Sequence, residues 1–309
     1  FDAHLALTNH YYVAGRITQA ESHIRPCLSL AESSQDSDQL VSAHRIMGEL
    51  AFYLGDLDCA IEHLGRAIEH YHVERQSALV LKLGDDPGIL ARPYLALSLW
   101  LKGEVGNAFK QCNEAIAEAE KFGHEYTLTQ ANFDTAWLHA IARSFESAKM
   151  FASKSIELCS NSKDEFRLYL GCASVLRGWV MTLEGNTTQG IKCIKQGMPL
   201  IEDTDAGICL GCFLPWLAEG LGHAGEIEEG LKVIRNAQET ATDHFYDAER
   251  LRIEGQLRTH IDRDGARRCF QAAIDASRKA SMKSLELRAA LALHDFQLSQ
   301  DEKVDIGGL

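Results

Sequence analysis

The chain has 309 residues, of which 31 are Lys or Arg and 44 are Asp or Glu, so its formal net charge is −13. This acidity argues against a surface that neutralises nucleic-acid phosphates, and a hydrophobic share of 46% is typical of a globular chain with a large buried core. No apolar run reaches the roughly 20 residues of a membrane span, and no basic and apolar leader opens the chain, so the sequence predicts a soluble, cytoplasmic protein.

Two further features concern the start of the chain and its compartment. The first residue is Phe1 rather than Met, which indicates a fragment of a longer protein. Nine cysteines are too sparse for a disulfide scaffold, and most lie in apolar helical stretches. We therefore expect free, buried thiols and a reducing cytoplasm.

In chain order, the apolar residues indicate seven pairs of helices followed by one more helix. The pairs are expected at about 1–36, 37–76, 86–123, 125–161, 164–204, 206–243 and 246–280, with a capping helix at 284–298 and a polar tail at 299–309. Within each helix the apolar residues recur at a helical spacing, as Ile61, Leu64 and Ile68 do, which predicts one buried stripe per helix. We expect residues 1–298 to form a single superhelical domain.

A turn glycine followed five residues later by a small residue recurs along the chain. The clearest examples are Gly15 with Ala20, Gly55 with Ala60, Gly103 with Ala108, Gly185 with Gly190, and Gly225 with Gly230. Including Ala148 and Ala266, which fill the same position more loosely, the small residues stand 36 to 48 residues apart. The glycine ends one helix because it adopts a left-handed backbone at little cost, and the small residue lets the two helices of a pair approach closely. Because one pair cannot bury its apolar faces alone, the sequence predicts stacked pairs in an all-α solenoid.

This pattern resembles the tetratricopeptide (TPR) repeat, in which a small residue is followed twelve positions later by Ala, as Ala96 is by Ala108. The unit here is about 40 residues, longer than the TPR norm of about 34. The resemblance implies a right-handed α-solenoid whose first helices line a concave face. The longest interval contains a turn cluster at residues 83–88, which we expect to be a connector, with Asp85 or Asp86 capping the next helix.

A more specific resemblance begins at residues 84–103 (GDDPGILARPYLALSLWLKG). This segment resembles part of the C-terminal TPR regions of bacterial signalling ATPases of the STAND class, many of which carry a class III adenylate/guanylate cyclase domain. Matching segments follow in order at 136–139, 176–179, 225–231, 248–255 and 283–289. The resemblance implies a regulatory arm that controls an attached NTPase and output domain. The sequence holds no Walker A loop, cyclase domain or DNA-binding module, so no catalytic residue carries over.

Three short motifs match functional patterns in part. Residues 220–225 read G-x-G-x-x-G, but a helix rather than a strand precedes them, so no nucleotide site is expected. Cys209 and Cys212 form a lone C-x-x-C, for which packing is favoured over zinc or redox chemistry. His63 and His70 lie near the end of one predicted helix, and a solvated helix end is favoured there over a metal site. No metal and no cofactor is expected.

The concave face remains as the candidate site. Transferring the TPR positions onto this chain gives the candidate lining Asn9, Tyr12, Arg45, Glu49, Phe52, Trp100, Phe133, Trp137, Trp179 and Glu219. Aromatic and Arg side chains dominate binding energy at interfaces, although a Trp at helical spacing also packs commonly against the neighbouring repeat. The sequence leaves open which of these two roles the aromatic residues have.

Three functions are compatible with this pattern. The leading hypothesis is a non-catalytic signalling arm that binds a partner protein or peptide on the concave face, with the attached NTPase or output domain as one candidate partner. The second is a small-molecule-sensing TPR-like domain of a signalling ATPase or transcription activator, which predicts a compact pocket with Arg45, Glu49 and Trp100 as first candidates. The third is a metal-dependent hydrolase built around the histidines. The sequence predicts neither nucleic acid nor a membrane as a partner, and it leaves the oligomeric state open.

Overall fold

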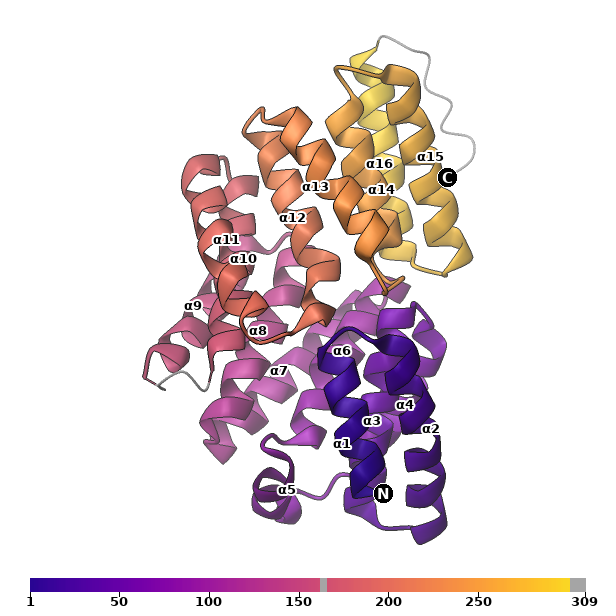
Figure 1. Cartoon of the computed structure of the whole chain (residues 1–309), viewed down its shortest axis with the longest axis vertical. Helices are drawn as coiled ribbons and strands as arrows, with labels where there is room; N and C mark the ends of the chain where they lie inside the picture. Colours follow the sequence, from indigo (N-terminus) through magenta and orange to yellow (C-terminus); the bar gives the residue numbers. More distant parts are fainter. Residues whose placement is uncertain (162–165, 301–309) are drawn as a thin grey trace.

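The computed structural model of the chain describes residues 1–161 and 166–300, which form sixteen α-helices and two short 3-10 helices without a strand (Figure 1). The predicted all-α solenoid of TPR-like helix pairs is confirmed. The first helices of the pairs are α1 (Asp2–Val13), α3 (Ser37–Leu54), α6 (Pro87–Lys102), α8 (Glu125–Ile141), α10 (Arg167–Leu183), α12 (Leu210–His223) and α14 (Asp247–Arg258). The second helices are α2 (Ile17–Ser34), α4 (Leu57–His70), α7 (Val105–Phe122), α9 (Phe145–Asn161), α11 (Thr187–Glu202), α13 (Ile227–Thr240) and α15 (Arg263–Lys279), and α16 (Lys283–Ser299) follows them. The predicted start of the fifth pair at residue 164 and residues 301–309 of the predicted tail lie outside the described residues.

The first and second helices form an inner and an outer layer. Most side chains of α3, α6 and α8 are buried on every side of the helix. The outer helix α4, in contrast, buries a single stripe that includes Ala60, Leu64 and Ala67. A polar side chain on an inner helix is therefore directed into protein rather than into water, and this is where a functional site is expected.

Small residues bring the two layers together. Gly55 ends α3 in the left-handed conformation, with φ of 79°. A Cβ atom added to Gly178 of α10 would lie 2.6 Å from the carbonyl oxygen of Gly190 in α11, so these two backbones are in direct contact. The small residues that mark the repeat in the sequence thus lie at the crossing of two helices.

The predicted connector between the second and third pairs contains a short helix. The 3-10 helix η1 (Val73–Arg75) leads into α5 (Gln76–Leu83), which the sequence reasoning missed because eight residues are too few to display a helical period. Leu79 is buried and Leu83 packs half-buried against the core, while Leu81 on this helix is 90% exposed. As predicted for one of two aspartates, Asp86 caps α6, and its carboxylate accepts hydrogen bonds from the next turn.

The superhelix bends so far that helix pairs distant along the chain touch. Helix α1 contacts the 3-10 helix η2 (Gly207–Cys209) of the sixth pair, and α6 contacts α16. The connection between α13 and α14 descends toward the N-terminal helices in Figure 1. It donates hydrogen bonds to the ends of α1 and α3. Thr242 Oγ1 donates to the carbonyl of Gly15 at 2.8 Å, and the amide of His244 donates to the carbonyl of Tyr53 at 2.7 Å. The concave face is therefore enclosed rather than an open groove along the whole stack.

No helix in the described part of the chain is both long and apolar enough to span a bilayer. Six of the nine cysteines are free thiols in the described part of the chain, namely Cys27, Cys59, Cys112, Cys159, Cys193 and Cys269, and four of these six are buried. The expectation of free thiols is confirmed for these six, and burial raises the pKa of the Cys112 thiol to about 12.

Candidate ligand cavity inside the superhelix

A cavity of about 190 Å³ lies inside the superhelix, and its lining extends from Leu5 to Phe213. Side chains of the inner helices α1, α3, α6, α8 and α10 line it, together with η2 and the first turn of α12. Leu83 at the end of α5 also contributes to its wall. A ligand in this cavity would contact helix pairs that are far apart along the chain.

One arginine and three carboxylates contribute charge to the cavity wall. Arg45 on α3 donates from Nε to Glu49 Oε1 at 2.7 Å, a contact that one helical turn provides, and from Nη1 to Asp85 Oδ1 at 2.8 Å. Burial alone would lower the pKa of Arg45, but Asp85 and Glu49 hold it well above its usual value. The guanidinium is therefore charged and already paired with two carboxylates.

The third carboxylate belongs to Asp134 in the middle of α8. Its side chain is 1% exposed, and its Oδ2 atom has no hydrogen-bond partner among the described residues. Burial raises the pKa of Asp134 well above its usual value, and the negative charge of Glu49 adds to this effect. The indole N–H of Trp137, three positions further on and also part of the cavity wall, has no acceptor within the described ranges.

Three tyrosine hydroxyls meet beside the cavity. Tyr12 donates to the hydroxyl oxygen of Tyr94 at 3.2 Å, and the hydroxyls of Tyr53 and Tyr94 lie 3.3 Å apart. These residues come from α1, α3 and α6, so the hydroxyl cluster joins the first three helix pairs. The cavity wall is therefore aromatic as well as charged.

Six of the ten residues predicted for the concave face line this cavity. They are Asn9, Tyr12, Arg45, Glu49, Phe133 and Trp137. The other four predicted residues lie elsewhere. Sequence spacing placed all ten on inner helices, but it did not reveal which part of the concave face is open and which is filled by side chains.

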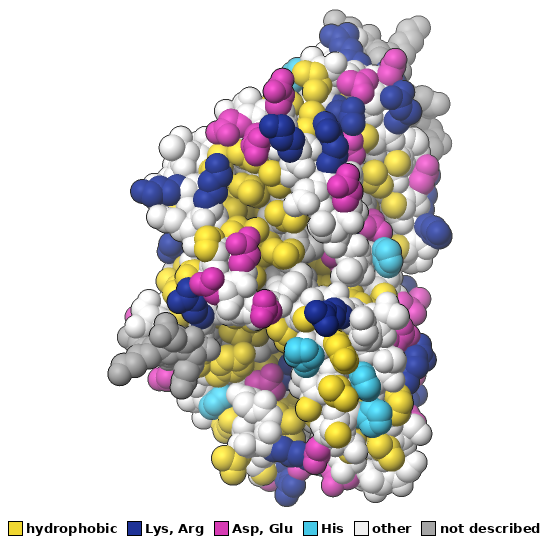
Figure 2. Space-filling view, viewed as in Figure 1, with side chains coloured by type: hydrophobic (Ala, Val, Ile, Leu, Met, Phe, Trp, Pro, Cys, Tyr) yellow, Lys and Arg dark blue, Asp and Glu magenta, His cyan; other side chains and the backbone are white. Residues whose placement is uncertain are grey.

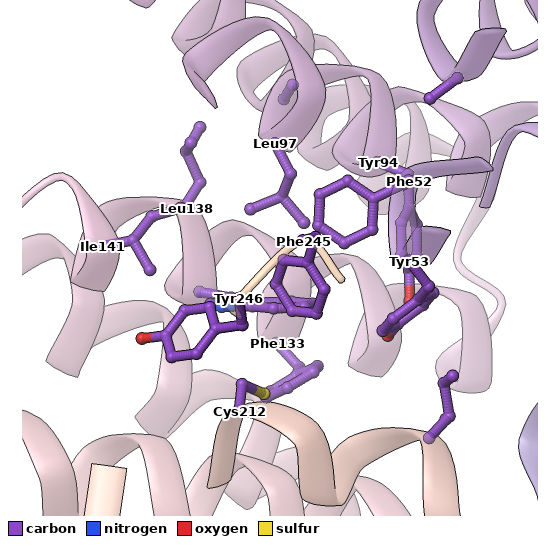
Figure 3. Close-up of a cluster of buried hydrophobic side chains, with 14 of the residues drawn as sticks. Phe52, Tyr53, Tyr94, Leu97, Phe133, Leu138, Ile141, Cys212, Phe245 and Tyr246 are labelled. Atoms are coloured by element: carbon purple, nitrogen blue, oxygen red, sulfur yellow. The ribbon is translucent and has the colours of Figure 1, made fainter. Parts of the chain in front are cut away.

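Phe52 and Trp100 are in the filled part. The ring of Phe52 packs on that of Phe245, with centroids 4.6 Å apart, and Figure 3 shows Phe245 among the aromatic side chains of the surrounding helices. Phe245 also contacts Trp137, with ring centroids 5.8 Å apart. Trp100 is 6% exposed, and the guanidinium of Arg288 lies 5.3 Å from its ring. At these positions the aromatic residues pack between repeats.

Trp179 and Glu219 belong to a second buried cluster, toward the C-terminal end. Trp179 stacks on Trp216 with centroids 4.5 Å apart, and its Nε1 donates to Glu219 Oε2 at 2.8 Å. Arg252 bridges Glu219 and Glu249 at 2.8 and 2.9 Å. Although burial disfavours a charge on Glu219, Arg252 keeps its pKa well below the usual value. This cluster holds α10, α12 and α14 together and does not line the cavity.

Sequence reasoning missed three residues that matter for the cavity chemistry, namely Asp134, Asp85 and Tyr94. Asp134 gave a usable signal, because it is a carboxylate among apolar and small residues on a helix that is buried on all sides. Asp85 could not be found in this way, since its pairing with Arg45 spans 40 residues. That contact depends on the insertion that carries α5.

The remaining motifs provide no site. Residues 220–225 lie at the end of α12, where Gly225 adopts φ of 81° in the turn to α13. Cys212 is buried, while the side chain of Cys209 lies outside the described part of the structure. The arrangement of the phosphate-binding fingerprint, a strand followed by a helix, does not occur here.

Two of the histidines predicted at a solvated helix end are partly exposed, and both also contact His44 on α3. His63 Nδ1 lies 2.8 Å from Nδ1 of His44, and the ring of His70 stacks on His44. His4 and His23 form a similar pair, with their Nδ1 atoms 3.2 Å apart. Figure 2 shows several histidines over the N-terminal helices. In the described ranges no three His, Cys, Asp or Glu side chains come together as a metal site, so the geometry lends the hydrolase hypothesis no support.

Comparison with known proteins identifies one distant relative in sequence and solved structures of similar fold. No family model matches the chain. An uncharacterized protein from Rhizobium meliloti (strain 1021) is 22% identical over 218 residues, and the match spans 69% of this chain but only 21% of that protein. The crystal structure of the apo form of RapI aligns with 94% of this chain and 98% of its own, at 12% identity and a TM-score of 0.55. A tetratricopeptide repeat protein from Parabacteroides merdae aligns over 94% of this chain and 98% of its own, at 13% identity and a TM-score of 0.44. The likeness to RapI agrees with the helix pairs described above, and the chain is a TPR-like α-solenoid.

Proposed function

We propose that the chain is a non-catalytic, ligand-binding arm of a longer signalling protein, and that ligand capture in its cavity regulates an attached NTPase and output domain. The single observation that carries this proposal is the cavity itself, whose wall combines residues from the first, second, third, fourth, fifth and sixth helix pairs. A ligand that binds the closed superhelix more tightly than a more open conformation would shift the population of conformations toward the closed one. Small changes in the packing of successive pairs accumulate along a solenoid, which provides a route to an attached domain.

The length of the relative supports a place within a larger protein. This chain spans about a fifth of the Rhizobium meliloti protein that it matches. The sequence resemblance to the TPR regions of STAND-class signalling ATPases suggests the identity of the attached domains. In this proposal residues 1–298 act as one regulatory unit, and the NTPase and cyclase activities belong to other parts of the longer chain.

The geometry favours a small ligand over an extended peptide. The α13–α14 connection fills the concave face with Phe245 and Tyr246, both 3% exposed, so that a compact cavity is left in place of a long groove. Compact pockets with a few polar groups are typical of small-molecule sites. This form of the proposal is the small-molecule sensor.

A partner protein or peptide is the second candidate, and one observation favours it. Val13, which contributes to the cavity wall, is 37% exposed, and Leu81 on the neighbouring α5 is 90% exposed. Apolar side chains exposed beside a cavity are typical of surfaces that bind proteins. A partner would cover these residues and insert one side chain into the cavity.

The test uses the longer protein and a substitution that blocks the cavity. Val13→Trp places a large side chain at the partly exposed edge of the wall, and Val105→Trp on the outer helix α7, where Val105 is 44% exposed, is the matched control. Nucleotide hydrolysis is measured with and without the small-metabolite fraction of a cell extract. We expect the fraction to change the rate in the wild type and in the Val105→Trp variant, but not in the Val13→Trp variant.

Two results would contradict the proposal. One is an unchanged hydrolysis rate after deletion of the whole arm, and the other is a Val13→Trp variant that responds as the wild type does. A response to the macromolecular fraction alone, lost in the Val13→Trp variant, would favour the partner protein over the small molecule.

A further inference from the structure

The charge of the cavity wall indicates the kind of ligand that it accepts. Arg45 faces three carboxylates, those of Glu49, Asp85 and Asp134, so the wall is acidic when all four groups are ionised. The guanidinium already donates to Glu49 and Asp85. An anionic ligand would have to break these two ion pairs and would find no other Arg or Lys among the described residues of the wall.

Asp134 brings to the cavity wall a buried acceptor that lacks a hydrogen-bond donor among the described residues. Its side chain is 1% exposed, and no described residue donates to its Oδ2 atom. An unpaired buried acceptor costs free energy, and the cost is larger for a charged group. Burial raises the pKa of Asp134, and a cationic ligand beside it would lower this pKa and favour the carboxylate. The ligand would then donate a charge-assisted hydrogen bond to this oxygen, which is stronger than a bond between neutral groups.

The rest of the wall suits a cation with an apolar body. Aromatic rings of Tyr12, Tyr94, Tyr126, Phe133, Trp137 and Tyr169 line the cavity. The face of an aromatic ring attracts a cation electrostatically, and several rings around one site bind organic ammonium groups. Its volume of about 190 Å³ resembles that of an engineered cavity of about 150 Å³ that accepts benzene, so the body is of about one aromatic ring.

We propose that the cavity binds a small organic ammonium ion, with the ammonium group paired to Asp134 and the apolar body among the aromatic side chains. This inference rests on the proposed function, because it names the ligand class of the same cavity. It excludes sugars and carboxylic acids as the preferred ligands, since neither brings a positive charge to Asp134.

The test compares three probes of nearly equal shape. The isolated chain is titrated by calorimetry with phenethylamine, with 2-phenylethanol as the uncharged analogue, and with 3-phenylpropanoate as the anion. We expect the ammonium probe to bind at least tenfold more tightly than the alcohol, and the anion to show no binding at about 1 mM. Equal binding of the ammonium and the alcohol, preferred binding of the anion, or no binding of any probe at about 1 mM would each overturn the proposal.

Two variants locate the site. Asp134→Asn keeps the size of the side chain and removes its charge, so we expect at least a tenfold loss of affinity for phenethylamine and little change for 2-phenylethanol. Asp58→Asn, at an outer position where the side chain is 83% exposed, is expected to bind as the wild type does. Because the Asp134 variant requires a folded cavity, protection of α8 amides from hydrogen exchange by phenethylamine in the wild type provides a second readout. Equal loss in both variants, or protection confined to other helices, would contradict the assignment.

The outcome is distinct from that of the hydrolysis experiment. If ammonium probes bind at Asp134 but leave the output of the longer protein unchanged, the regulatory function is wrong and the ligand class stands. If blocking the cavity removes regulation but no ammonium probe binds, the ligand class is wrong and the regulatory function stands.

Discussion

Replacing Gly by Ala is predicted to have opposite effects at two positions. Gly178 lies where the backbones of α10 and α11 are in contact, whereas Gly65 has no close neighbour. In Gly178→Ala, the new Cβ would lie 2.6 Å from the carbonyl oxygen of Gly190 and 2.9 Å from Cβ of Cys193. Ordinary contacts begin near 3.4 Å, so the two helices must separate by about 0.8 Å at their crossing. In Gly65→Ala, the Cβ meets no atom within 4 Å, although Gly65 also lies inside a helix, α4.

The expected magnitudes follow from two opposing effects. Replacing Gly by Ala inside a helix stabilises it by about 1 kcal/mol, whereas overpacking costs about 1–3 kcal/mol. Because the atom in the way at Gly178 is a backbone oxygen, which no rotamer change can move, we expect an overpacking cost of about 2–3 kcal/mol and a net loss of about 1–2 kcal/mol there. At Gly65 we expect a gain of about 0.5–1 kcal/mol, with no packing cost.

Urea unfolding followed by circular dichroism measures both changes in the free energy of unfolding. Equal slopes of the unfolding curves would show that the variants differ in stability rather than in the surface exposed on unfolding. A Gly178→Ala variant as stable as the wild type, together with a stabilised Gly65→Ala variant, would refute the close approach of α10 and α11. Destabilisation at both positions would refute the propensity argument instead.

Three further substitutions test the acid-sensitive network, the closure of the superhelix and the cap of α6. Burial disfavours a charge on Glu249, but Arg252 helps to lower the pKa of Glu249 to about 2. The charge on Glu249 therefore contributes to stability above about pH 4.3, and this contribution is lost as the pH falls toward 2. Glu249→Gln should therefore lower the free energy of unfolding by about 3–5 kcal/mol near neutral pH and flatten its fall between about pH 5 and pH 2. An unchanged pH profile in urea unfolding would contradict this. Phe245→Ala should cost about 3–5 kcal/mol and speed hydrogen exchange in α1, and unchanged exchange there would argue against the closed superhelix. Tyr71→Phe removes a hydrogen bond of 2.7 Å to buried Asp86 and should cost about 1–3 kcal/mol in thermal or urea unfolding, with equal stability as the contrary result.

Local features of the chain were predictable because they depend on nearby residues. The turn after Gly55, the small residues at the crossing of α10 and α11, and the cap of α6 all follow from neighbours within one or two turns. The helix α5 was not predicted because a segment of eight residues, of which Leu79 alone is fully buried, shows no periodicity. The pairing of His44 with His63 was not predicted because it joins the two helices of a pair across a turn.

The sequence by itself determined that this protein is a stack of TPR-like helix pairs, and which helices face inward. The physical reason is that the local spacing of small and apolar residues predicts the repeat of helix, turn and helix. Only the tertiary structure decided which part of the inner face remains open. The insertion of Phe245 into an aromatic cluster with Phe52, and the ion pair between Arg45 and Asp85, join residues 193 and 40 positions apart. Such contacts depend on the total rotation between distant helix pairs, which accumulates from pair to pair. Local sequence patterns do not predict this total rotation. For the same reason Asp134, a buried acid in an aromatic cavity, became a candidate for ligand binding only after the superhelix had closed around it.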